Sequence, residues 1–105
     1  MIKLAVPPHI DSTNLEMKPK VIRGKSITLN CPVQGIPFPN ITWLKNGNLL
    51  LESERIRYLL NGRQLEISLA QESDASDYTC LATNIAGKAT KEFTLEVLGE
   101  FHKAI

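Results

Sequence analysis

Hydrophobic and polar positions alternate along several short stretches of this chain. In residues 26–34 the apolar positions are Ile27, Leu29, Cys31 and Val33, with polar residues or proline mostly between them. The same period of two returns in Leu65, Ile67 and Leu69, in Tyr78, Cys80 and Ala82, and in Phe93, Leu95 and Val97. Because side chains on a strand alternate between two faces, each stretch predicts a half-buried β-strand whose apolar residues line a core.

Turn-forming residues separate these stretches at the intervals that short strands require. They include Gly24, Asn46-Gly47, Asn61-Gly62 and Gly87. Residues 70–76 are the best helical candidate, but the segment is short and rich in Ser and Asp, so it predicts a turn. Because one flat sheet would leave an apolar face in water, we expect two packed sheets. The pattern predicts an all-β sandwich of seven to nine strands with minimal helix.

Length and charge narrow the class of protein. The 105 residues are expected to form one domain, and about 30% Leu, Ile, Val and Phe is enough to fold it. Twelve basic against eleven acidic residues give a net charge of +1, which favours neither nucleic acid nor an anionic membrane as partner. The longest apolar runs have three residues, whereas a membrane span needs about 20. We expect no membrane insertion of this domain and place any secretion signal upstream of it.

The chain has two cysteines, Cys31 and Cys80, and both fall on inward-facing positions. A bridge between them would close a ring of about 50 residues and stabilise the fold by about 4 kcal/mol. Two buried free thiols are the alternative, since cysteine packs well as a small hydrophobe and the cytosol keeps it reduced. A metal site is disfavoured because two cysteines without an adjacent histidine or a CxxC spacing supply too few ligands. The alternation alone leaves the bridge and the free thiols open.

Two aromatic residues lie at informative sequence spacings from these cysteines. Trp43 follows Cys31 by twelve residues, and Tyr78 precedes Cys80 by two. With this spacing the chain resembles an immunoglobulin domain of the intermediate, or I-set, type over about residues 8–98. The matching residues are Val21, Gly24, Ile27, Leu29, Cys31, Gly35, Pro37, Pro39, Trp43, Lys45, Asn46, Gly47, Leu65, Ile67, Asp74, Tyr78, Cys80, Ala82, Asn84, Gly87, Leu95 and Val97. The resemblance implies a Greek-key β-sandwich with a Cys31–Cys80 disulfide, Trp43 packed on it, and a Tyr78 hydroxyl bonded back to the preceding turn.

The turn before Tyr78 departs from the family pattern at one position. Ser76 stands where the family usually has glycine, so a positive φ there would strain the backbone or shift the turn. Asp74 matches a family position that pairs with an arginine, for which Arg55 and Arg57 are both available. The resemblance therefore implies an ion pair between Asp74 and an arginine, rather than a catalytic pair of carboxylates formed by Asp74 and Asp77.

Catalytic candidates are few. His9 and His102 lie near opposite ends of the chain, and nothing places a nucleophilic Ser or Cys beside either one. The glycines are scattered singly rather than gathered in a phosphate loop, and no DxDxDG calcium loop occurs. We expect no enzymatic activity, no cofactor and no metal site.

The two ends of the chain look different from its middle. Leu-Ala-Val at residues 4–6 is similar to Leu-Glu-Val at residues 95–97, as if the last strand of another domain came first. We interpret residues 1–7 as the tail of a preceding domain or a linker, 8–98 as the I-set domain, and 99–105 as a linker or residues added by cloning. The Val-Pro-Pro-x-Ile junction resembles those of hemicentins, extracellular matrix proteins built of long immunoglobulin arrays. Pro7 and Pro8 would stiffen such a junction.

These features predict a non-catalytic module that binds proteins. We expect an adhesion or interaction domain of an extracellular matrix or cell-surface array, with homophilic or neighbouring domains among its partners. The alternative is a structural spacer of an intracellular muscle filament protein, which is also built of I-set domains. The redox state of Cys31 and Cys80 separates the two.

Asn40-Ile41-Thr42 is the only N-x-[ST] sequon in the chain. It predicts a glycan on Asn40 if the domain passes through a secretory pathway. In the alternative interpretation, Thr42 is merely a good strand former.

A contact surface follows from the alternation of the two strands that carry Trp43 and Cys80. Because those residues face inward, Leu44 and Leu81 must face outward from the same sheet. We expect them to form a contact face with Thr42, Thr79, Thr83 and Glu96 as its polar surround. The alternative is a pair of ordinary exposed leucines, shielded by Leu49 or Leu51.

Overall fold

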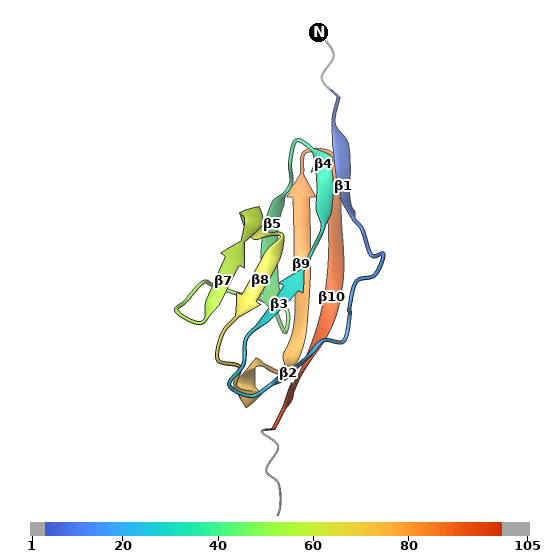
Figure 1. Ribbon diagram of the computed structural model, residues 1–105. Helices are drawn as coiled ribbons and strands as arrows, with labels where there is room; N and C mark the ends of the chain where they lie inside the picture. The colour runs from blue at the N-terminus through green and yellow to red at the C-terminus, as the bar shows by residue number, and fades with distance from the viewer. Residues whose placement is uncertain (1–3, 100–105) are drawn as a thin grey trace, which may run out of the picture.

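Ten strands form the domain in the computed structural model, which describes residues 4–99 (Figure 1). They are β1 (Val6–Ile10), β2 (Lys20–Ile22), β3 (Ile27–Asn30), β4 (Val33–Ile36), β5 (Asn40–Lys45), β6 (Asn48–Leu49), β7 (Ile56–Leu59), β8 (Gln64–Ile67), β9 (Ser76–Asn84) and β10 (Gly87–Leu98). Two single turns of 3-10 helix, η1 (Leu60–Gly62) and η2 (Glu72–Asp74), interrupt the loops. The all-β prediction is confirmed, and η2 lies within the predicted turn.

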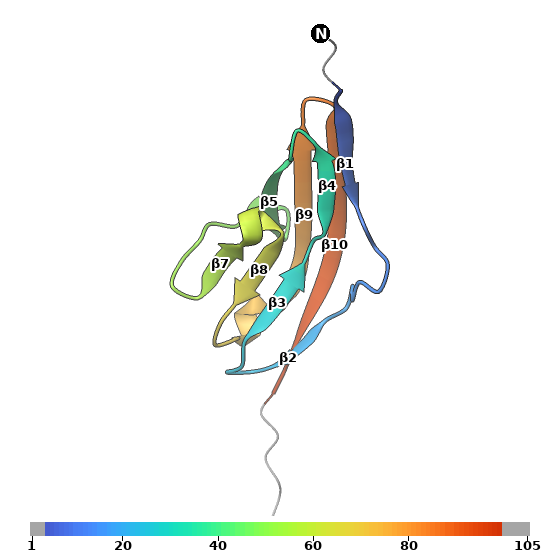
Figure 2. The ribbon, with the colours of Figure 1, turned by 45° about the horizontal axis from the view of Figure 1, so that its top comes forward.

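The strands pack in two layers. One is a five-stranded sheet in the order β2-β10-β9-β5-β6, antiparallel except for the parallel pair of β10 with β2. The other contains the three-stranded sheet β3-β8-β7, and β4 continues from β3 to pair with β1. Figures 1 and 2 show β3, β7 and β8 in front of the large sheet, with β1 and β4 toward the N-terminal end of the molecule. The fold is an immunoglobulin-like sandwich.

The strand count exceeds the predicted seven to nine because one expected strand is split. Residues 26–34 read as one alternating stretch, yet β3 and β4 are separated at Cys31 and Pro32. The Cys31 amide donates to the Arg63 carbonyl (2.7 Å), on the side of β8. Pro32 has no amide to donate, and its carbonyl accepts from Asp11 instead (3.0 Å). The chain thus changes its pairing partner from β8 to β1 at this proline.

The core lies between the layers, and most of the alternating apolar residues line it. Its buried members are Ile10, Val21, Leu29, Cys31, Val33, Trp43, Ile56, Leu65, Ile67, Ala70, Tyr78, Cys80, Ala82, Phe93 and Leu95. The prediction for Leu69 is wrong, because Leu69 lies beyond the end of β8 with a φ of 50° and is exposed. The Trp43 and Phe93 rings lie 5.7 Å apart between centroids, tilted by 39°. Such a tilted aromatic pair stabilises the core beyond its buried area, because the ring edge and ring face carry opposite partial charges.

Ser76 does not carry the strain that a positive φ would impose. It is the first residue of β9, and the left-handed non-glycine residues of the described chain are Asn14, Asn46, Leu60, Asn61 and Leu69. Asn46 and Gly47 have φ of 51° and 81°, which matches the two-residue turn that joins β5 to β6. Extended backbone at Ser76 explains why serine replaces glycine there without a shifted turn.

Candidate functional site

The two cysteines join the layers. Cys31, between β3 and β4, is disulfide-bonded to Cys80 of β9, with a Cα–Cα distance of 6.5 Å. Both are fully buried, and Trp43 of β5 stands directly opposite Cys80 in the strand register. The Trp43 indole Nε1–H donates to the Gly62 carbonyl (2.8 Å), so its one polar group is satisfied inside the core. This arrangement ties η1 and both sheets to one centre.

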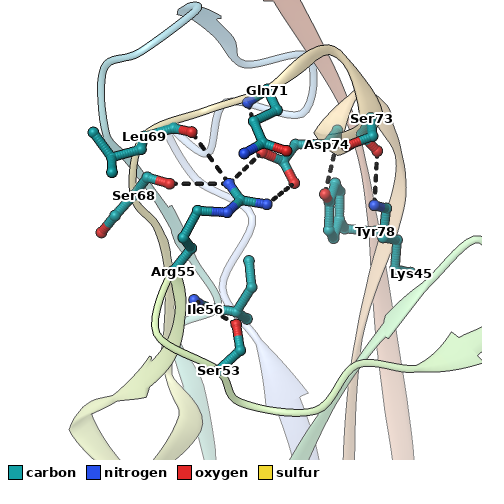
Figure 3. A network of polar contacts seen from close by, with 10 residues as sticks. All are labelled: Lys45, Ser53, Arg55, Ile56, Ser68, Leu69, Gln71, Ser73, Asp74 and Tyr78. Atoms are coloured by element: carbon teal, nitrogen blue, oxygen red, sulfur yellow. Dashed lines mark hydrogen bonds and ion pairs between the residues drawn. The ribbon is translucent and has the colours of Figure 1, made fainter.

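Tyr78 fills the end of the core that lies next to η2. Its hydroxyl donates to the Asp74 carbonyl in η2 at 2.6 Å, and its side chain is fully buried (Figure 3). Burial, followed by the nearby negative charge of Asp74, raises the pKa of Tyr78 well above its ordinary value. The phenol therefore stays protonated and keeps donating to the turn at every physiological pH.

An ion pair with Asp74 also fixes this turn. The arginine that pairs with Asp74 is Arg55, not Arg57. The Arg55 guanidinium binds the Asp74 carboxylate through two bonds, Nη1 to Oδ2 (2.8 Å) and Nη2 to Oδ1 (3.1 Å). It also donates to the carbonyls of Ser68 (3.0 Å) and Leu69 (3.2 Å), as Figure 3 shows. We call this cluster, with Tyr78, the Arg55–Asp74 corner. A bidentate pair of this kind is stronger and more directional than a single contact.

Asp74 is the one buried charged residue of the described chain, with a side chain 3% exposed. Burial by itself would raise the pKa of Asp74. The hydrogen bonds from Arg55 and from the Gln71 amide (2.8 Å), together with the charge of Arg55, outweigh that effect, so the pKa is lowered. The same pair raises the pKa of Arg55. The charged forms therefore hold this corner together.

Sequence reasoning missed two polar anchors of this region. Lys45 reaches from β5 to donate to the Ser73 carbonyl of η2 (2.7 Å). The Tyr58 hydroxyl accepts from the Trp43 amide (3.2 Å) and donates to the Leu50 carbonyl. The signal for Tyr58 was present in the sequence, since Ile56 and Tyr58 alternate around an arginine like the other strand segments. Nothing local in the sequence marks Lys45 as an anchor.

The predicted contact face lies on β5 and β9, where its leucines are only half-buried. In register, Thr42 stands opposite Leu81, and Leu44 stands opposite Thr79. Leu44 and Leu81 are intermediate in exposure, and Thr42, Thr79 and Thr83 are as well. Leu49 of β6, directly opposite Leu44, is 60% exposed and is the most open apolar side chain of this face.

One residue of the predicted polar surround is misplaced. Glu96 lies beyond the end of β9, because the last paired residues of β9 and β10 are Ser76 and Leu95. The β10 residues that stand opposite Thr79 and Leu81 are Glu92 and Thr90. The error arises because alternation gives the face of a residue but not its position along the strand.

Other exposed apolar residues lie at the two ends of the sandwich. At one end lie Leu4, Val6, Ile36 and Ile85, which we call the apolar tip. Val6 and Ile36 are opposite each other in β1 and β4, and Ile85, 85% exposed, lies in the β9–β10 turn. The Asn84 side chain donates to the carbonyls of Val6 (2.8 Å) and Pro37 (3.0 Å), which holds these segments together. Ile22, Leu69 and Leu98 are exposed at the opposite end.

Asn40 is exposed at the start of β5, opposite Thr83. Phe38, two residues earlier, is 46% exposed, and the guanidinium carbon of Arg63 lies 5.5 Å from the centre of its ring. Phe38, Pro39, Asn40, Ile41 and Asn61 line one shallow hollow. The sequon and an aromatic ring thus share a surface.

Groups that carry catalysis in other proteins are dispersed here. His9 is exposed on β1. The prediction for His102, like those for residues 1–3 and 100–105, concerns residues outside the described range. Asp77 lies on β9 and accepts a hydrogen bond from the Thr94 hydroxyl (2.8 Å), whereas the Asp74 carboxylate in η2 binds Arg55. Within residues 4–99 no three His, Cys, Asp or Glu side chains converge as metal ligands do, and no helix has the length and apolarity to cross a membrane.

Comparison with known proteins identifies a matching domain profile and several similar proteins. The profile of the immunoglobulin I-set domain matches residues 9–97. Human hemicentin-1 is 43% identical to the chain over 97 residues, which are 92% of the chain and 2% of that protein. Neural cell adhesion molecule 1-A of Xenopus laevis is 31% identical over 93 residues, 88% of the chain and 8% of that protein. The chain therefore spans a small fraction of the length of these relatives.

A solved structure shows the same architecture. One chain in a crystal structure of a mutant complex of titin with an obscurin-like 1 immunoglobulin domain superposes with a TM-score of 0.82 at 31% identity, covering 94% of this chain and 100% of that one. The disulfide, the opposed Trp43 and the Tyr78 corner occupy the positions that the family resemblance implies. This chain is similar to hemicentin and to cell adhesion molecules, and it belongs to the immunoglobulin I-set family.

Proposed function

We propose that this domain is a non-catalytic interaction and adhesion module of a tandem immunoglobulin array in the extracellular matrix or at the cell surface. The observation that carries the proposal is the buried Cys31–Cys80 bridge, because disulfides persist in oxidising compartments and are rare in the cytosol. Similarity to hemicentin-1 and to a neural cell adhesion molecule supports it. Titin supports the intracellular spacer alternative through the fold alone.

The redox state of the cysteines in the protein from its natural source tests the location. The protein is denatured and alkylated without reductant, and the peptides that contain Cys31 and Cys80 are weighed. We expect no alkylation of either residue, because the bridge protects both. Alkylation of both cysteines would favour the intracellular spacer.

We assign contacts with neighbouring domains of the array to the two ends of the sandwich. The described chain enters at the apolar tip and leaves at the opposite end, where Ile22 stands opposite Leu98 (Figure 1). A head-to-tail contact would bury both apolar ends, although a few exposed apolar side chains at each end support only a modest interface. Pro7 and Pro8 lie in β1, next to the apolar tip, and would stiffen the chain where it enters the domain.

We assign contacts with other proteins to the face of Leu44, Leu81, Thr42, Thr79 and Thr83, extended to Leu49. Its half-buried leucines gain less from association than open ones would, so we expect weak homophilic or partner binding. Changing Leu44 and Leu81 together to Ser should abolish association, and Leu49→Ser should weaken it with an unchanged melting temperature. Association that survives both variants would assign adhesion to another surface.

A further inference from the structure

We propose that Asn40 carries an N-linked glycan whose first sugar ring packs on the side chain of Phe38. The proposal rests on the extracellular function above, since the glycan is attached in a secretory pathway. In that reaction the Asn40 Nδ2 displaces a lipid diphosphate from the anomeric carbon of an activated oligosaccharide. A C–N bond forms, the C–O bond to the diphosphate breaks, and one amide proton is released.

The position of Asn40 leaves room for a glycan. Its side chain is exposed, and β6 pairs only with Leu44 and Lys45, so the Asn40 end of β5 has no β6 neighbour on that edge. On its other edge Asn40 stands opposite Thr83, near the end of β9. A branched sugar can therefore project past the end of the sheet without displacing a strand.

Phe38 provides a platform beside that position. A phenyl ring that is nearly half exposed costs free energy in water unless something covers it. Pro39 is buried and restricts the backbone between the ring and Asn40, so their spacing is held. The Arg63 guanidinium lies over one face of the ring, 5.5 Å from its centre, and holds it in place, so the sugar is expected on the other face. The C–H face of a pyranose ring is apolar and matches the electron-rich face of an aromatic ring.

Occupancy of the site is tested on the whole chain secreted from mammalian cells. Peptide N-glycosidase in ¹⁸O-labelled water should lower the mass and leave labelled aspartate at position 40. Asn40→Gln should abolish the mass loss, whereas Thr42→Ser, which keeps the hydroxyl, should retain it. An unchanged mass of the wild type would overturn the glycan site and leave the disulfide argument for an extracellular module standing. Glycosylated protein without any partner would reject adhesion and leave the glycan proposal intact.

The platform is tested by comparing melting temperatures before and after deglycosylation. We expect the wild type to lose about 2–4 °C when the glycan is removed, and Phe38→Ala to lose less than about 1 °C. Leu51→Ala is the matched control, because Leu51 is also exposed and lies outside the hollow. It should behave like the wild type. An equal loss in Phe38→Ala and Leu51→Ala would overturn the stacking.

Discussion

The Arg55–Asp74 corner and the apolar tip show opposite solutions to the problem of placing side chains at an end of the sandwich. At the corner, the side chains of Arg55, Asp74 and Tyr78 all have hydrogen-bond partners within the domain. At the tip, Val6, Ile36 and Ile85 remain exposed, and only the backbone beneath them is anchored, by Asn84. The polar groups of the corner are satisfied within the domain, whereas the tip leaves apolar side chains exposed to solvent.

Breaking the corner should give the largest loss of stability. Asp74→Ala leaves the Arg55 guanidinium and the Gln71 amide without their acceptor, so we expect the free energy of unfolding to fall by about 3 kcal/mol. Urea denaturation measures this loss. Asp77→Ala is the control, because Asp77 is exposed and its side chain bonds to the exposed Thr94 hydroxyl; the change should cost less than about 0.5 kcal/mol. Equal effects of the two variants would contradict the role of the corner.

Removing one hydroxyl from the corner should have a smaller effect. Tyr78→Phe keeps the buried ring but deprives the Asp74 carbonyl of its donor, which should cost about 1–2 kcal/mol. For a domain of this size that corresponds to a drop of about 4–16 °C in melting temperature. A calorimetric scan that shows no drop would mean that water replaces the hydroxyl.

Acid should weaken the corner before it affects the tip. Because the pKa of Asp74 is lower in the folded than in the unfolded chain, the unfolded state binds more protons once the pH falls below about 4. Stability is therefore fully present above that pH and is lost as the pH falls through the folded pKa. Asp74→Asn should flatten the pH dependence of the free energy of unfolding, measured by urea denaturation between about pH 5 and pH 2. A slope equal to that of the wild type would exclude Asp74 as its source.

Changing the tip should barely affect stability. Ile85→Ser together with Ile36→Ser removes exposed apolar surface, so the free energy of unfolding should change by less than about 0.5 kcal/mol per site. In a fragment that joins this domain to a preceding domain of the proposed array, the same variant should broaden the distance distribution in small-angle scattering. Leu51→Ser, away from the tip, should leave it narrow. A pair that is compact and folded back in the wild type would contradict the end-to-end contact.

Much of the fold could be predicted because its determinants are local or periodic. The alternation gave the inward faces of Tyr78 and Cys80, and the spacing to Trp43 identified the family. The choice between Arg55 and Arg57 could not be predicted. It depends on the carbonyls of Ser68 and Leu69, which the pairing of β7 with β8 brings to Arg55 in the folded chain.

The candidate surface was less predictable than the core for a physical reason. Alternation assigned Leu44 and Leu81 to the outer face, but their actual exposure depends on the neighbours that the sheet supplies, such as Leu49. The tip escaped prediction because its members come from three separate segments. Only the folded chain places Val6 beside Ile36 and near the turn that carries Ile85.

The disulfide also sets a mechanical limit on the domain. Cys31 and Cys80 are 49 positions apart in sequence, and while the bridge is intact a pull on the two ends cannot lengthen the chain between them. At about 3.5 Å per extended residue the bridge withholds about 170 Å of length. Under tension such a domain lengthens only through the segments outside the ring, which are β1 to β3, the end of β9 after Cys80, and β10. An array of such domains would extend by short, bounded steps.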